Sequence, residues 1–210
     1  MNKLLYVIVA VVALAAGAFI YHGINQKESP KHALYYETPR AIKPFTLTDH
    51  SGSAFSKEQL EGQWSWVFFG YTSCPDVCPM TLQKLNYVYD DLTAIAENNQ
   101  VLLVSVDPNR DHVEKLSQYI GYFNPAFKAL RAEHDVLYPF ARNLGLMYAI
   151  VDDTEQQGYL VDHSASIVLI NPQGEIAAIF KPKQVLGEVP TINEDDLVAD
   201  FARVVALAGS

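Results

Sequence analysis

Residues 64–80 read WSWVFFGYTSCPDVCPM, and this stretch decides the fold. Its first eight residues, 64–71, are apolar on both faces, as expected of a central strand that is covered on both sides of a sheet. The turn that follows holds Cys74 and Cys78, the only two cysteines in the chain, and a proline follows each of them. In an open α/β sheet, ligands and chemistry gather where a strand hands over to a helix. The sequence therefore predicts a functional site at this turn.

Helices and strands alternate along the chain after this turn. Apolar residues recur at three- and four-residue spacing over residues 80–98, which predicts an amphipathic helix. Residues 101–107, VLLVSVD, predict a second strand that is buried on both faces, and residues 110–122 predict a second helix. The order strand, helix, strand, helix is typical of a parallel sheet.

The flanking segments predict the antiparallel part of the sheet. The predicted elements are a short hairpin over 44–55, a helix start capped by Ser56, a helix over 137–144 ended by Gly145, a strand over 146–153, an inserted hairpin over 154–161, a hairpin over 166–180 with its turn at 171–174, and a terminal helix over 193–208. Together these elements predict an α/β domain with a thioredoxin-like mixed sheet and helices on both faces.

The N-terminal residues are more apolar than the rest of the chain. An uncharged, proline-free run extends from Leu4 to Tyr21, which matches the ~18 residues at which a membrane span is favoured. A cleaved signal peptide is the alternative, but its apolar core is usually only ~7 to 15 residues long. We therefore predict a transmembrane anchor over 1–21, a tether over 22–41 and the folded domain over 42–210. The first 25 residues contain no arginine, which favours a bacterial inner-membrane protein with a periplasmic domain.

The overall composition excludes some classes of protein. The formal charge of −9 argues against a nucleic-acid binder, because such proteins usually present a basic face to phosphates. Two cysteines are too few for the disulfide framework of a small secreted domain. The cysteines therefore form one site or one disulfide.

The cysteine pair permits three interpretations, namely a structural disulfide, a thiol-disulfide exchange site and a soft-metal site. Exchange sites usually have the spacing C-x-x-C, which is one residue tighter than the C-x-x-x-C of this chain. Two thiolates bind Cu(I) strongly, because this soft ion accepts low coordination numbers. The spacing alone leaves all three interpretations open.

The two prolines bear on the position of the sulfurs. Pro79 fits the first position of a helix, which places Cys78 at the N-cap. Pro75 suits the second position of a tight turn over residues 74–77. We therefore expect both sulfurs near the positive end of a helix dipole, which lowers a thiol pKa.

A third ligand would favour the metal site. Of the six histidines, His163 ends the loop before the predicted strand at 166, whereas the others lie in the tether, the first turn or predicted helix starts. In thioredoxin-like domains this loop faces the cysteine turn and normally carries a cis-proline beside the active thiols. Residues 162–165 contain no proline. The chain therefore lacks one part of the usual redox enzyme and has a metal ligand near its place.

At these motifs the chain resembles the SCO/SenC family of membrane-anchored copper chaperones. The resemblance rests on FFGYTSCPDVCPMTL at 68–82, VSVDPNRD at 104–111 and VDHSASIVLINPQG at 161–174. It implies a thioredoxin-like fold, an inner-membrane anchor, and Cu(I) held by Cys74, Cys78 and His163. It also implies that subunit II of cytochrome c oxidase is the partner, that its CuA centre receives the copper, and that an upstream donor supplies it.

The hypothesis that follows is copper delivery rather than catalysis. Two thiolates and a neutral imidazole around Cu(I) give a site with a net charge near −1, which a helix terminus can partly offset. Asp76 and Asp162 are candidate hydrogen-bond partners of the ligands, although a carboxylate beside a turn is more often simply solvated, and we interpret Met80 as a core residue. The alternative function is a thiol-disulfide reductase that acts on the oxidase cysteines, and a third is a tethered scaffold with an inert disulfide. Whether Cu(II) also binds stays open.

Overall fold

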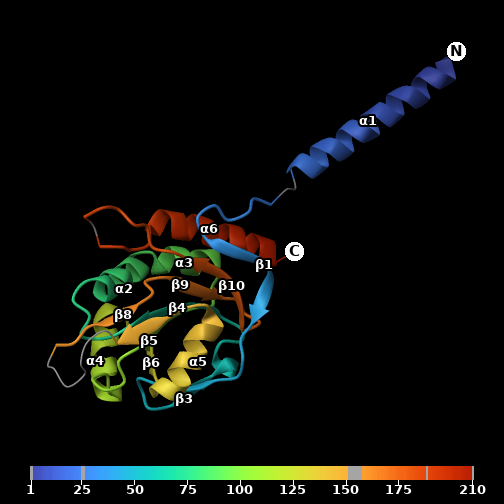
Figure 1. Ribbon diagram of the computed structural model, residues 1–210. Coiled ribbons are helices and arrows are strands. Elements are labelled where there is room, and N and C mark those ends of the chain that lie inside the picture. The colour runs from blue at the N-terminus through green and yellow to red at the C-terminus, as the bar shows by residue number, and fades with distance from the viewer. Residues whose placement is uncertain (1, 25–26, 151–157, 188, 210) are drawn as a thin grey trace.

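The computed structural model describes residues 2–24, 27–150, 158–187 and 189–209. An eight-stranded mixed sheet lies at its centre, in the order β1-β10-β9-β4-β5-β6-β2-β3 (Figure 1). The strands of this sheet are β1 (Leu34–Ala41), β2 (Thr46–Asp49), β3 (Ala54–Ser56), β4 (Trp64–Gly70), β5 (Asn99–Ser105), β6 (Lys128–Arg131), β9 (Ile167–Ile170) and β10 (Glu175–Phe180). A separate two-stranded sheet pairs β7 (Tyr148–Ile150) with β8 (Val161–His163).

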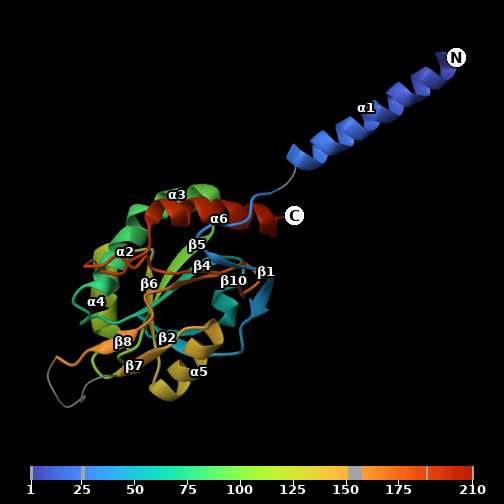
Figure 2. The same ribbon diagram turned by 45° about the horizontal axis from the view of Figure 1, so that its top comes forward.

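Helices cover both faces of the large sheet, as predicted. The helices of the described residues are α1 (Asn2–Ile24), the 3-10 helix η1 (Lys57–Gln59), α2 (Val77–Tyr87), α3 (Tyr89–Ile95), α4 (Val113–Phe123), α5 (His134–Leu144) and α6 (Glu194–Ala208), of which α1 does not cover the sheet (Figure 1). In both views α3 and α6 lie on one side of the strands and α5 lies on the other (Figures 1 and 2). The predicted mixed sheet is therefore confirmed in its layers.

The two central strands position the site. Every residue of β4 and of β5 is buried, as their apolar sequences predicted. The two strands are parallel and in register from Trp64 opposite Asn99 to Gly70 opposite Ser105. Because parallel strands end at the same edge of a sheet, the chain segments that follow Gly70 and Ser105 leave the sheet side by side.

The helix after the cysteine turn differs from the prediction. It begins at Val77 rather than at Pro79, and it is divided into α2 and α3 at Val88. Cys78 is consequently the second residue of the helix, and it is not the N-cap. Pro79 is accommodated because the amides of the first helical turn have no partner within the helix.

The predicted domain boundary at residue 42 is wrong. Residues 34–41, which we assigned to the tether, form β1 and pair antiparallel with β10. The three residues before β1 are also held, because the buried carboxylate of Asp200 on α6 accepts hydrogen bonds from the amides of Lys31, His32 and Ala33 at 2.8, 2.6 and 2.8 Å. Most side chains of this edge strand are exposed, so its sequence carries no clear apolar alternation.

The N-terminal apolar run forms helix α1. Within the part of the chain that the structure describes, no helix is long and apolar enough to cross a membrane. The transmembrane anchor therefore stays a prediction. Residues 154–157 of the inserted hairpin predicted over 154–161, and residues 151–153 of the strand predicted over 146–153, lie outside the described residues.

Candidate metal centre

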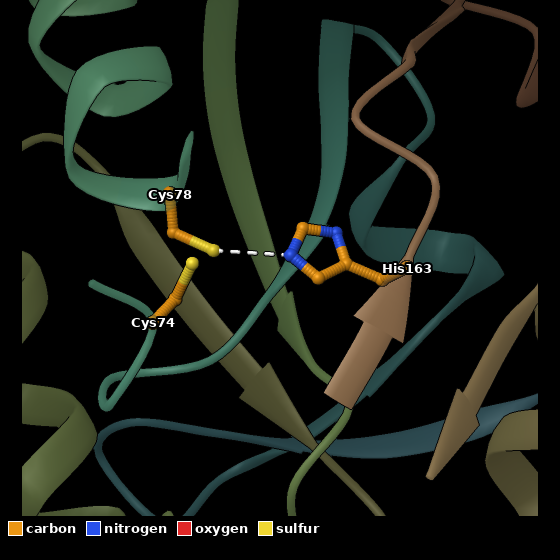
Figure 3. Close-up of side chains that lie close together, drawn as sticks. All are labelled: Cys74, Cys78 and His163. Carbon is orange, nitrogen blue, oxygen red and sulfur yellow. Dashed lines mark hydrogen bonds between the residues drawn. The ribbon is translucent and has the colours of Figure 1, made fainter. Parts of the chain in front are cut away.

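Three side chains from two distant segments meet at the edge of the large sheet. Cys74 lies in the turn after β4, Cys78 in the first turn of α2, and His163 at the end of β8 (Figure 3). Their two sulfurs and one ring nitrogen all lie within 4.8 Å of one another. The Sγ atom of Cys78 is 3.3 Å from Nε2 of His163. The structure thus brings together the three residues that the sequence singled out.

The cysteine turn is held by backbone contacts. The amide of Cys74 donates to the carbonyl of Tyr71 at 3.2 Å, and the amide of Met80 donates to the carbonyl of Asp76 at 3.2 Å. The amide of Thr72 donates to Oδ2 of Asp111 at 3.0 Å. The turn is therefore fixed on both sides of Cys74.

His163 is oriented by its strand and by two aromatic rings. It pairs with Tyr148 in the β7–β8 sheet. The rings of Phe68 and Tyr71 each approach the imidazole edge-on, with centroids 5.9 Å away. Nδ1 lies 3.3 Å from the carbonyl oxygen of Ser164, which can only accept a hydrogen bond. This contact favours a proton on Nδ1 and leaves the lone pair of Nε2 directed at the sulfurs.

The surroundings shift the pKa values of the two thiols in opposite directions. The pKa of Cys74 is lowered to about 4, chiefly because the Cys78 thiol donates a hydrogen bond to the Cys74 thiolate. Burial raises the pKa of Cys78, and the neighbouring Cys74 raises it further. Cys78 is fully buried whereas Cys74 is partly exposed. In the metal-free pair the proton therefore belongs to Cys78 and the negative charge to Cys74.

Alkylation should distinguish the two thiols in the native, reduced protein. An ordinary cysteine is under about 1% thiolate at pH 6, whereas a thiol with a pKa of about 4 remains thiolate until the pH falls to that value. We expect a short iodoacetamide pulse to label Cys74 at a nearly constant rate from pH 5 to pH 8, and to leave Cys78 unlabelled. Peptide mass spectrometry measures both sites.

The same pulse on the urea-unfolded chain is the control for this experiment. Both cysteines should then react at rates that rise about tenfold per pH unit, as ordinary thiols do below their pKa. Equal labelling of Cys74 and Cys78 in the native protein would contradict the assignment of the charge to Cys74.

The two aspartates considered as partners of the ligands lie at the margin of the site, as expected of solvated turn carboxylates. Asp76 is the N-cap residue of α2, and both Asp76 and Asp162 are exposed. Met80 was predicted to be a core residue, but 37% of it is exposed, because it lies on the outer side of the first turn of α2.

Two other histidines of the folded domain have different partners. His112 is the N-cap residue of α4, and His134 contacts the hydroxyl of Tyr148 at 2.9 Å. Among the described residues, neither of these histidines belongs to the cluster.

Sequence reasoning missed the residues that hold the ligand segments in place. Asp111 contacts the cysteine turn, and Arg110 contacts Tyr159 in the segment that leads into the strand of His163. Two of them belong to the VSVDPNRD motif, so the signal was present, but the sequence did not show which segments the motif would touch.

Comparison with known proteins places the chain in a family. The model of the SCO1/SenC family matches residues 35–192. The mitochondrial SCO1 homolog of Homo sapiens is 34% identical over 166 residues, which cover 78% of this chain and 54% of that protein. The SCO2-like protein of Rickettsia prowazekii is 30% identical over 180 residues, which cover 82% and 88%. The chain thus spans about half the length of the human relative.

Solved structures agree with the sequence match. Arabidopsis thaliana ScoI with copper bound superposes with a TM-score of 0.69 at 26% identity, covering 79% of this chain and 98% of that one. Yeast Sco1 with copper bound superposes with a TM-score of 0.63 at 27% identity, covering 77% and 88%. The family model matches well over half of the residues of this chain, and the chain therefore belongs to the SCO1/SenC family.

Proposed function

We propose that this protein binds Cu(I) as cargo through Cys74, Cys78 and His163 and delivers it to another protein, without acting as an enzyme. The observation that carries the proposal is the convergence of two sulfurs and one imidazole nitrogen within 4.8 Å. Thiolate and imidazole are ligands that suit copper, and the soft Cu(I) ion accepts three of them. The copper-bound structures of the Arabidopsis and yeast relatives support this choice of metal.

The surroundings of the cluster suit a transfer by ligand exchange. A cleft of about 720 Å³ opens beside it, and its lining includes Cys74, His163, Val77 and Val189. A donor group of a partner can enter from this side and bind the copper while one of the chain's own ligands leaves. The ion stays Cu(I) throughout. When it departs, the buried Cys78 takes up a proton, which agrees with its raised pKa.

The acceptor that we propose is the CuA centre of cytochrome c oxidase subunit II, with an upstream donor that loads the protein. The resemblance of the three motifs to those of the family's copper chaperones supports this partner. In the same proposal α1 anchors the protein in the bacterial inner membrane, and the domain from β1 onward lies in the periplasm. Detergent-dependent solubility of the full chain would support the anchor.

Anaerobic titration of the reduced full chain tests copper binding. We expect one Cu(I) per chain, measured in competition with a chromophoric Cu(I) chelator, and no binding once Cys74 and Cys78 are oxidised to a disulfide. Substitution His163→Ala should weaken binding markedly, because it removes one of three donors. A stoichiometry or affinity that is unchanged in His163→Ala would contradict the proposed site.

A thiol-disulfide reductase is the second candidate function, and one observation favours it. A partly exposed thiol of low pKa beside a buried thiol is the arrangement of an exchange pair. The variant His163→Ala separates the two functions, because exchange needs only the cysteines. If His163→Ala restores oxidase activity fully in cells that lack this protein, the reductase is favoured, and if it fails to do so, copper delivery is favoured.

A further inference from the structure

The segment Asp107–Asp111 of the VSVDPNRD motif contacts both the cysteine turn and the segment that leads to His163. It follows β5, and it turns back on itself through hydrogen bonds from the amides of Arg110 and Asp111 to the carbonyl of Asp107, at 3.2 and 3.0 Å. β5 ends beside β4, so this turn leaves the sheet next to the cysteine turn. The function proposed above assigns it no role.

One side of this turn holds the cysteines. The carboxylate of Asp111 is fully buried and accepts hydrogen bonds from the amide of Thr72 at 3.0 Å and from the hydroxyl of Ser105 at 2.7 Å. The hydroxyl of Thr72 also donates to it. Thr72 lies two residues before Cys74, so Asp111 ties the start of the cysteine turn to the end of β5.

The other side of the turn holds the segment that carries His163. The Arg110 guanidinium lies 3.6 Å above the ring centroid of Tyr159, and its Nη2 donates to the Tyr159 carbonyl at 2.9 Å. Its Nε is paired with Asp107, and Asp107 also accepts the hydroxyl of Tyr159. The ring, the hydroxyl and the carbonyl of Tyr159 are thus all held, and Tyr159 is 5% exposed.

Among the described residues, the strand that presents His163 is otherwise held by its short pairing with β7, by the amide of Ser164, which donates to the Met147 carbonyl at 3.1 Å, and by the rings of Phe68 and Tyr71. β8 and β7 pair over only three residues, from Tyr148 opposite His163 to Ile150 opposite Val161. A two-stranded sheet is at best marginally stable without further packing. The amide of Val161 also donates to the hydroxyl of Tyr71, but this contact is long, at 3.4 Å. The position of β8 therefore depends in part on how Tyr159 is held, two residues before the strand begins.

We propose that Arg110 is a positioning residue for the metal centre. It fixes Tyr159 against Asp107, which holds β8 in place and keeps Nε2 of His163 within reach of both sulfurs. Among the interactions described, Arg110 contacts neither the cysteines nor the imidazole, so it acts through Tyr159 and through Tyr71, whose ring centroid lies 5.6 Å from the guanidinium carbon and whose ring is edge-on to His163. The proposal rests on the function proposed above, since it explains how one of the three copper donors is held.

The test is a double-mutant cycle between Arg110→Met and His163→Ala in the full chain. Methionine keeps an unbranched apolar stem and removes the guanidinium. We expect Arg110→Met to lower the Cu(I) affinity by roughly 10- to 100-fold, the usual effect of losing a group that orients a ligand. In the His163→Ala background the same change should alter the affinity by less than about twofold, because the residue acts only through the imidazole.

Two further measurements separate positioning from a general effect on folding. Hydrogen exchange of the metal-free protein should be faster at the amides of residues 161–163 in Arg110→Met, with the amides of β4 and β5 unchanged. Arg110→Lys keeps a charge for Asp107 but loses the planar contact with Tyr159, so it should restore the affinity only in part. Tyr159→Leu removes the partner of the guanidinium and should reproduce both effects if Arg110→Met proves too unstable to study.

Arg203→Met is the matched control. Arg203 and Arg110 are each 22% exposed in their side chains, and each pairs with a buried aspartate three residues away, but Arg203 lies on α6. The variant Arg203→Met should leave the Cu(I) affinity unchanged.

Two results would overturn the proposal. One is an equal loss of Cu(I) affinity on Arg110→Met with and without His163, and the other is unchanged hydrogen exchange at residues 161–163 in Arg110→Met. If the wild-type protein bound no Cu(I), the proposed function would fail, while the exchange experiment would still decide whether Arg110 holds β8.

Discussion

Replacing Cys78 by serine is expected to abolish tight Cu(I) binding while the fold survives. Cys78 is fully buried, and its sulfur lies 3.3 Å from the imidazole, so it is the donor that links the cysteine turn to His163. A hydroxyl is a hard ligand that does not replace a thiolate on Cu(I). The loss should exceed the roughly 10- to 100-fold that follows removal of an orienting group. Competition with a chromophoric chelator measures the affinity.

The stability of this variant should fall by only about 1–2 kcal/mol. A buried hydroxyl without a partner costs about 1–3 kcal/mol, but Nε2 of His163 is near enough to accept a hydrogen bond from the hydroxyl of the introduced serine after a small shift. Thr81→Val is the matched control, because Thr81 is equally buried one turn further along α2 and its hydroxyl has no partner among the described residues. It should leave the Cu(I) affinity unchanged. Wild-type affinity in Cys78→Ser would place the copper elsewhere.

The sequence was most informative where burial is complete. The runs that form β4 and β5 are apolar on both faces because both faces of these strands are covered, and such runs are distinctive in any sequence. The hairpin of β9 and β10 was equally clear, because Asn171 and Gly174 form its turn. The amide of Gly174 donates to the carbonyl of Asn171 at 2.9 Å, and the glycine adopts a positive φ of 70°.

Elements that depend on pairing rather than on burial could not be predicted. β1 and β6 are short or exposed, and each is held by backbone bonds to a neighbour that is distant in sequence. The division between α2 and α3 at Val88 does not interrupt the apolar periodicity, so the pattern indicated one continuous helix. Propensity and periodicity carry no information about which strand will lie alongside an edge.

In the candidate site, too, some residues could be predicted from the sequence and others could not. Cys74, Cys78 and His163 could be singled out because few residue types bind soft metals and because their motifs are specific. The residues that hold the ligand segments in place could not be predicted, because the contacts from Asp111 to Thr72 and from Arg110 to Tyr159 join residues 39 and 49 positions apart. Whether an aspartate in a turn faces solvent or a distant amide is decided by the tertiary structure.

Gly70→Ala is expected to damage stability and copper binding together. A Cβ added at Gly70 would lie 2.9 Å from Sγ of Cys78, 3.0 Å from a ring carbon of Phe68 and 3.1 Å from a methyl carbon of Leu103. These distances are well inside the ~3.5–4.0 Å of favourable contact between carbon atoms. Overpacking of this kind costs about 1–3 kcal/mol in a well-packed core. Because one of the crowded atoms is the Cys78 sulfur, relief of the clash should move it away from His163 and weaken Cu(I) binding.

Urea unfolding of the metal-free protein and Cu(I) competition measure the two effects. Gly121→Ala is the control, since nothing lies within 4 Å of a Cβ at this position of α4, and alanine there should stabilise the protein by about 0.5–1 kcal/mol. The clash with the sulfur also predicts coupling: in Gly70→Ala with Cys78→Ser the smaller oxygen should relieve part of the strain, so the total destabilisation should be less than the sum of the two single effects. Strict additivity would mean that Phe68 and Leu103, rather than Cys78, oppose a side chain at residue 70.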